Sequence, residues 1–288
     1  MAAAFIHYFL GVGLAYLFGY TGLDALLLGL VGAVQDLDFI SFFFYKQVMK
    51  TKYSQLLMHR GMTHTVWFPF LCSGLLIFNP AISALVFINF MLHIFTDYVT
   101  AWGVSPFIPF STKRYSLGLM TIFDIPLVTV SFFVGVAGFV SVNLVVAFAA
   151  FFGYIFLRFV LKQRLKYNDL TPMGNITYAF CIPEDDYIVG KVDILGREET
   201  ISVKKCESDI DSVLLEKVES TVGRSPLFHL MEYPTYTIEG DSVKIKDARS
   251  YLFPKSNRFG FMVFFDRESE KLYVQIAGRR VELPIENL

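Results

Sequence analysis

The chain has 288 residues, of which 54% are hydrophobic and 31 are phenylalanine, more apolar content than the core of a soluble domain requires. Its formal net charge of −1 averages two unlike halves, because the first glutamate of the chain is Glu184. We expect no nucleic-acid partner. The composition changes near Leu161–Asp169, which predicts a transmembrane helical domain over residues 1–166 and a second domain over residues 167–288.

Six apolar runs in the first domain are long enough, or nearly so, to cross a bilayer, which takes about 17–25 residues. They are Ala2–Gly19, Leu23–Phe44, Thr65–Phe78, Ala81–Trp102, Thr121–Phe139 and Val142–Leu161. The sequence therefore predicts an α-helical polytopic membrane domain of about six spans.

Basic residues predict the orientation of these runs, because Lys and Arg are enriched in cytoplasmic loops. Lys46, Lys50, Lys52 and Arg60 lie between the second and third runs, Lys113 and Arg114 between the fourth and fifth, and Arg158, Lys162, Arg164 and Lys166 at the end of the sixth. All three segments fall on one side if both termini are cytoplasmic. We therefore expect a multi-pass protein of the inner membrane with both termini in the cytoplasm.

The first domain also carries a group of ionisable residues, each costing roughly 2.5–3.5 kcal/mol at the centre of a membrane helix. In the six-span arrangement, all members of the group fall towards the cytoplasmic face. They are His7, Asp36, Asp38, His59, His64, His93, Asp97 and Asp124. This convergence predicts a shared site.

The spacings within this group predict different local arrangements. His93 and Asp97 are four apart, which puts them on one face of a helix, although a structural ion pair has the same spacing. Asp36 and Asp38 are two apart and would diverge unless the helix ends there. In the segment 59–64, Gly61 favours a turn and Thr63 can cap the next helix, so that His59 and His64 can reach one point.

Imidazole and carboxylate groups without thiolates favour zinc, with manganese or iron as alternatives, and the number of candidates allows one or two ions. The predicted metal ligands are His7, Asp36, His59, His64, His93 and Asp97. Asp38 or Asp124 is predicted to act as a general base or to support a ligand. Arg60 is predicted to neutralise developing negative charge, with contact to a lipid headgroup as its alternative.

Three segments resemble a known family: 29–38 (GLVGAVQDLD), 59–64 (HRGMTH) and 93–97 (HIFTD). They resemble the YdjM-like inner-membrane metal-dependent hydrolases, as do His7, the segment 102–111 and Asp124. Gln35 departs from the pattern, because a small residue or proline is expected before the aspartates, and Thr65 stands where serine is common. The segments 225–236 and 243–251 resemble the tail of longer members. The resemblance implies hydrolase chemistry, and a distant likeness to zinc-dependent phospholipases C favours a phosphoester.

In the second domain, apolar and polar residues alternate as in strands near 178–182, 187–195, 199–205, 235–238, 242–246, 259–265 and 271–277. A helix is predicted over about 209–220. It is predicted to be a small soluble α+β domain with an antiparallel sheet and a cytoplasmic accessory role. His229 is predicted to be a packed or surface residue.

The whole sequence thus predicts a membrane-embedded hydrolase of an ester or phosphoester, with a membrane lipid or lipid-linked molecule as the expected partner. A metal- or proton-coupled transporter and a non-catalytic scaffold are the alternatives. Transport sites lie near the middle of the bilayer, whereas these residues gather at one end of the predicted spans.

Overall fold

The computed structural model describes residues 2–38, 60–111, 113–121, 123–140, 142–206, 210, 212–222, 232–252, 263–276 and 279–282. The chain forms two compact units. The first contains Met1–Lys166 and Thr171–Ile176, and the second contains Tyr167–Leu170 and Thr177–Leu288. Residues 171–176 return to the helical unit, where the backbone carbonyl of Asn175 accepts a hydrogen bond from the buried guanidinium of Arg158.

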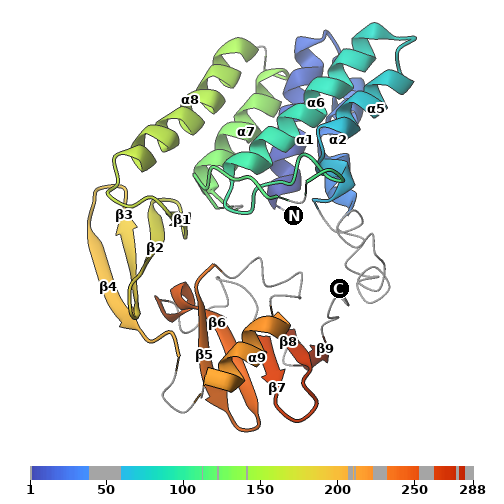
Figure 1. Ribbon diagram of the computed structural model, residues 1–288. Coiled ribbons are helices and arrows are strands. Elements are labelled where there is room, and N and C mark those ends of the chain that lie inside the picture. The colour runs from blue at the N-terminus through green and yellow to red at the C-terminus, as the bar shows by residue number, and fades with distance from the viewer. Residues whose placement is uncertain are drawn as a thin grey trace. The chain divides into compact units, whose positions relative to one another are not determined.

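The first unit is helical (Figure 1). Among its described residues the α-helices are α1 (Ala2–Leu17), α2 (Gly22–Val34), α5 (Trp67–Leu75), α6 (Pro80–Val99), α7 (Ile125–Ala137) and α8 (Leu144–Gln163), and the 3-10 helix η2 spans Met62–His64. Side-chain caps fix the starts of the later helices, since Asn79, Asp124 and Asn143 each accept a hydrogen bond from a backbone N–H of the helix that follows. After α2, residues 35–38 tighten into a 3-10 turn.

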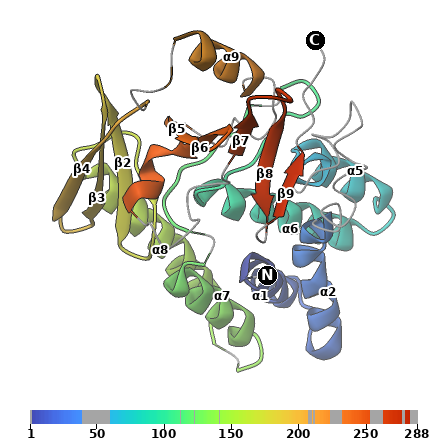
Figure 2. The same ribbon diagram turned by 90° about the horizontal axis from the view of Figure 1, so that it is seen from below.

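Glycines let α1 and α2 pack with their backbones close together. A Cβ on Gly32 would lie 2.3 Å from the carbonyl oxygen of His7, and one on Gly11 would lie 2.8 Å from that of Gly29. The helices α6 and α7 also pack against α1, as both views of the molecule show (Figures 1 and 2). This packing brings His7 on α1 next to the C-terminal end of α2.

The expectation of six membrane spans is wrong for the described residues. Two of their helices, α6 and α8, combine the length and apolarity needed to cross a membrane. Helices α1, α2, α5 and α7 have 16, 13, 9 and 13 residues, fewer than the roughly 17 a span requires. The apolar runs continue past the ends of these helices: the 3-10 turn ends α2, and Gly19 adopts a φ of 86° after α1.

The second unit contains two antiparallel sheets, where the sequence predicted one. Its strands are β2 (Thr177–Pro183), β3 (Tyr187–Asp193), β4 (Glu198–Val203), β5 (Pro234–Glu239), β6 (Ser242–Asp247), β7 (Val263–Asp266), β8 (Leu272–Ile276) and β9 (Arg279–Glu282); the two-residue strand β1 (Thr171–Pro172) precedes them. The strands β2 to β4 pair in chain order, as do β5 to β9. Helix α9 (Ser212–Val222) packs Val218 and Val222 into the core of the second sheet (Figure 2).

A buried ion-pair cluster joins the end of β6 to the 3-10 helix η4 (Ala248–Leu252). The guanidinium of Arg249 donates from Nε and Nη2 to the carboxylate of Asp247, and from Nη1 to Glu232. Asp247 also accepts from the backbone N–H groups of Glu232 and Tyr233. These satisfied contacts give Asp247 and Arg249 a structural role in the second unit.

Candidate metal centre

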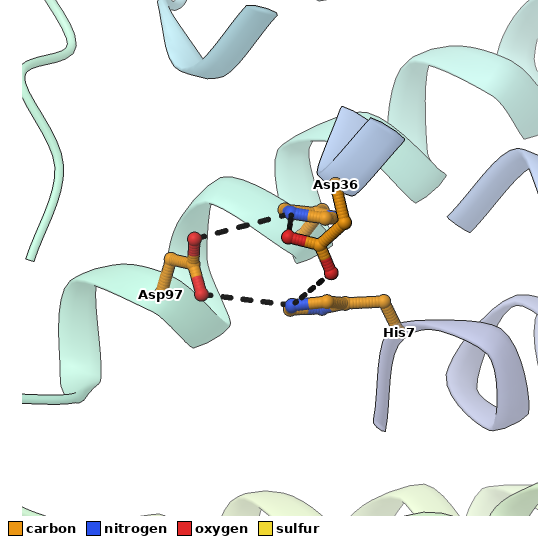
Figure 3. A group of neighbouring side chains, drawn as sticks. His7, Asp36 and Asp97 are labelled. Atoms are coloured by element: carbon orange, nitrogen blue, oxygen red, sulfur yellow. Dashed lines mark ion pairs between the residues drawn. The ribbon is translucent and has the colours of Figure 1, made fainter. Parts of the chain in front are cut away.

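Four side chains from three segments of the helical unit converge on one point: His7, Asp36, His93 and Asp97. His7 comes from α1, Asp36 from the 3-10 turn after α2, and the other two from the last turns of α6. The four offer ligand atoms that all lie within 4.8 Å of one another. Figure 3 shows the side chains of His7, Asp36 and Asp97 pointing toward one another.

The distances between these atoms are close to those of a coordination sphere. Nε2 of His7 lies 3.6 Å from Oδ1 of Asp97 and 3.8 Å from Oδ2 of Asp36. Nε2 of His93 lies 3.7 Å from Oδ1 of Asp36 and 3.9 Å from Oδ2 of Asp97. In a tetrahedral site with bonds of about 2.0–2.1 Å, neighbouring ligand atoms lie about 3.3 Å apart. A small shortening of these distances would therefore let the four ligand atoms coordinate one ion.

Hydrogen bonds on the far side of each imidazole determine which nitrogen faces the centre. Nδ1 of His93 lies 2.6 Å from the carbonyl oxygen of Gly32, which can only accept, so Nδ1 carries the proton. Nδ1 of His7 lies 3.0 Å from Oγ1 of Thr96, whose own proton goes to the carbonyl of Leu92 or His93. Both imidazoles, when neutral, thus direct an Nε2 lone pair at the centre, as metal-binding histidines do.

The inward-facing atoms lack partners of their own. Nε2 of His7, Oδ2 of Asp36 and Oδ2 of Asp97 are buried and form no hydrogen bond with any described residue. Unpaired buried acceptors are rare because leaving one unsatisfied costs about 1–3 kcal/mol. A cation at the centre would satisfy all three at once, and the donor set of two imidazoles and two carboxylates fits a divalent metal ion.

Asp38 and His64 form a second layer beside this centre. Oδ2 of Asp38 lies 3.1 Å from Nδ1 of His64 and also accepts from the hydroxyl of Thr63. This pairing turns Nε2 of His64 inward, 3.1 Å from Nε2 of His93 and 3.4 Å from Oδ2 of Asp97. Burial by itself would lower the pKa of His64, but the neighbouring carboxylates of Asp38 and Asp97 raise that pKa to about 9. The protonated, positively charged form of His64 is therefore favoured.

Arg60 is buried and ties the segment before η2 to the centre. Its Nη2 donates to Oδ1 of Asp97 at 2.8 Å and its Nη1 to the carbonyl of Gly103 at 2.9 Å, while its backbone N–H donates to Asp38. A φ of 65° at Arg60, unusual for a residue with a side chain, accompanies this arrangement. The guanidinium Nε is buried without a hydrogen bond.

One further candidate residue, Asp124, lies elsewhere. Asp124 caps α7 and accepts hydrogen bonds from the hydroxyl of Tyr154 at 2.6 Å and from Arg158 at 3.0 Å. The structure thus places Asp124 in a buried cluster of its own rather than among the four converging side chains. His59 lies outside the described residues, as does His229.

Sequence reasoning missed two groups that orient the histidines, Thr96 and the carbonyl of Gly32. Thr96 had a detectable signal, because it is a polar residue in an apolar helix, three positions after His93 and next to Asp97. The carbonyl of Gly32 had no such signal, since its role depends on how α2 packs against α6. Gln35, which departs from the family pattern, donates from Nε2 to the carbonyl of Thr63 and so holds the 3-10 turn against the segment before α5.

Comparison with known proteins assigns the helical region to a family. The model of the family described as "YdjM inner membrane protein" matches residues 1–165, which include all four converging side chains. "Uncharacterized protein YfhP" of Bacillus subtilis (strain 168) is 28% identical over 123 residues, which cover 38% of this chain and 37% of YfhP. No solved structure matches the chain. Because the family model covers more than half of its length, this chain belongs to the YdjM family of inner membrane proteins.

Proposed function

We propose that the protein is a membrane-bound hydrolase that cleaves an ester or phosphoester, with one divalent metal ion held by His7, Asp36, His93 and Asp97. The observation that carries this proposal is the set of unpaired inward-facing acceptors, Nε2 of His7 and Oδ2 of Asp36 and of Asp97. Zinc suits two imidazoles and two carboxylates at these distances, and manganese or iron is the alternative.

A divalent ion at this position would supply Lewis acidity and lower the pKa of a coordinated water towards about 7. The protein's own residues hold and orient the site. Thr96 and the carbonyl of Gly32 keep the Nδ1 protons of His7 and His93 outward. Arg60 keeps Asp97 in place through its 2.8 Å hydrogen bond. His64, held by Asp38, presents Nε2 to the same centre, where its protonated form can donate a hydrogen bond or a proton.

Access to the centre is favoured on the side of the two aspartates. The side chains of Asp36 and Asp38 keep 13% and 10% of their surface exposed, whereas those of His7, His93 and Asp97 keep 2% or less. A substrate and the attacking water would therefore approach past the 3-10 turn.

We also propose that this centre lies at the membrane interface, on the cytoplasmic side. The segment that follows α6 exposes Trp102, Phe107 and Phe110 and continues into the basic residues Lys113 and Arg114. Aromatic side chains next to basic ones are typical of the headgroup region, and basic residues favour the cytoplasmic face. A substrate in or on the membrane fits this position.

The proposal is tested by the metal content of purified full-length protein and of variants. We expect close to one equivalent of zinc, manganese or iron, lost on Asp36→Asn and on His93→Ala because each removes a ligand. Asp24→Asn is the matched control, since Asp24 is exposed in the first turn of the same helix α2. His64→Ala should weaken metal binding less than His93→Ala does, because His64 lies outside the group of four.

Turnover is tested with p-nitrophenyl acetate and bis(p-nitrophenyl) phosphate as probes of ester and phosphoester cleavage. We expect hydrolysis that a chelator removes and the metal restores. Full metal occupancy in both Asp36→Asn and His93→Ala would contradict the proposed centre. A metal-loaded protein without turnover on either probe would instead favour the transporter or scaffold.

A further inference from the structure

We propose that Arg114 binds the negatively charged oxygens of the substrate, so that the site takes a phosphoester or phosphate group rather than a neutral ester. This inference rests on the proposed function, because it assumes a metal ion in the four-residue centre. Arg114 lies in the segment 100–120 between α6 and α7, outside the residues that build that centre.

The fold ties this segment to the end of α6. Backbone hydrogen bonds run from Leu117 to Tyr98 and from Leu119 to Val99, the first and second residues after the ligand Asp97. Val104 and Tyr115 pair in both directions, at 2.9 and 2.7 Å. Arg114 thus directly precedes Tyr115, which is held opposite Val104. Gly103, the residue before Val104, accepts the hydrogen bond from Arg60.

The charges of Arg60 and Asp97 both act on the guanidinium of Arg114. Burial lowers the pKa of Arg114, the guanidinium of Arg60 lowers it further, and the carboxylate of Asp97 opposes both. The side chain of Arg114 nonetheless has solvent-exposed surface, and its guanidinium forms no ion pair with a described carboxylate. Because no carboxylate among the described residues pairs with Arg114, its guanidinium can receive an anion.

The charge of the site favours an anion once the metal is bound. Asp36, Asp38 and Asp97 carry three negative charges, and Arg60 and Arg114 carry two positive ones. With His7 and His93 neutral and His64 protonated, these charges sum to zero, and a bound divalent cation changes the sum to +2. Guanidinium groups match the planar spacing of phosphate oxygens and form strong charge-assisted hydrogen bonds. The unpaired Nε of buried Arg60 adds a second donor.

The neighbouring Lys113 provides a matched control. It has the same charge and is also exposed, but its ammonium group lies over the ring of Tyr115, 5.4 Å from the ring centroid. Removing either charge changes the general attraction of this loop for anions equally. Only the loss of Arg114 should remove a specific contact.

The experiment measures binding of inorganic phosphate by calorimetry to zinc-loaded full-length protein, to Arg114→Gln and to Lys113→Gln. We expect Arg114→Gln to weaken phosphate binding about tenfold or more, and Lys113→Gln to change it less than about twofold. Zinc content should be the same in all three proteins. Phosphate binding that survives Arg114→Gln, or that falls equally in both variants, would overturn the inference, as would zinc-loaded wild type that binds no phosphate.

A second arm identifies the source of the phosphate group, using short-chain phosphatidic acid in the same detergent. Tighter binding of phosphatidic acid than of phosphate, lost in Arg114→Gln, supports a lipid headgroup. Equal binding of the two, again lost in Arg114→Gln, supports a soluble phosphoester. Wild-type protein that binds no metal would refute the proposed function itself, and metal content distinguishes that failure from a failure of Arg114.

Discussion

Thr96 has the smallest side chain that bears on the chemistry of the centre. Its hydroxyl proton is used by a carbonyl one turn earlier in α6, so its oxygen is left to accept from Nδ1 of His7. One hydroxyl group thus determines which ring nitrogen of His7 is unprotonated. Partners of this kind hold metal-binding histidines in position in many metalloproteins.

Replacing Thr96 by valine should weaken metal binding by about 10–100-fold while leaving the four ligands in place, because His7 loses the acceptor that fixes its tautomer. The measurement is competition for zinc against a chelating dye. Thr129→Val is the control, since Thr129 in α7 makes the same hydrogen bond to a carbonyl one turn earlier but is exposed. Equal zinc affinity in the two variants would refute this role of Thr96.

Residue spacing predicted part of the centre. His93 and Asp97, four apart on one helix, both face the cluster, as a helical period requires. The two aspartates two apart could share a site only if the helix ended there, and α2 does end at Val34. The sequence could not reveal that Asp124 is held by Tyr154 and Arg158, because those partners lie 30 and 34 residues away and become neighbours only through helix packing.

At the scale of elements, the contact between α1 and α2 sets the width of the centre. Gly32 faces the backbone of His7 directly, and its own carbonyl orients His93. The same glycine therefore permits the helices to approach and positions a ligand carried by a third helix. Any side chain at this position must separate the two helices or bend one of them.

Gly32→Ala should destabilise the protein by about 1–3 kcal/mol, the usual cost of overpacking, and should lower metal affinity at the same time. Thermal unfolding in detergent and zinc content would measure the two effects. Gly153→Ala in α8 is the control, because a Cβ there meets nothing within 4 Å. That substitution should be neutral or should stabilise the helix by up to about 1 kcal/mol. Similar losses in both variants would contradict the close-contact explanation.

Hydropathy located helices but not where they end. The apolar run 23–44 contains α2, yet the helix stops at Val34 and the chain tightens into a 3-10 turn that presents Asp36 and Asp38. Hydropathy measures how apolar a segment is and carries no information on such turns. Helix ends depend on local hydrogen bonds, so counting apolar runs overestimated the number of spans.

At the scale of the whole molecule, α8 joins the family's membrane region to the β-sheet unit. The helix has 20 residues, and only 17% of its most apolar 18-residue stretch is buried inside the protein. Most of its side chains therefore face outward, where an apolar environment would suit them. Lys162, Arg164 and Lys166 follow at its C-terminal end. From this pattern we predict that α8 crosses the membrane and that its C-terminal end lies in the cytoplasm.

A reporter enzyme that is active only outside the cytoplasm tests this orientation. Fused after Leu288, it should be inactive, because basic residues retain the end of α8 in the cytoplasm. Fused after Asn143, at the other end of α8, it should be active. The same signal at both positions would mean that α8 does not cross the membrane.

The distribution of the metal-binding residues along the chain has a consequence for biogenesis. The N-terminal helix pair, already held together by its glycines, carries His7 and Asp36, and the other two ligands arrive only with α6. During synthesis, which proceeds from the N-terminus, the nascent chain thus has only two of the four proposed ligands until Asp97 has left the ribosome. In the proposed centre, metal binding would therefore follow the docking of α6 on the first two helices, and a chain in which that docking fails would not acquire its ion.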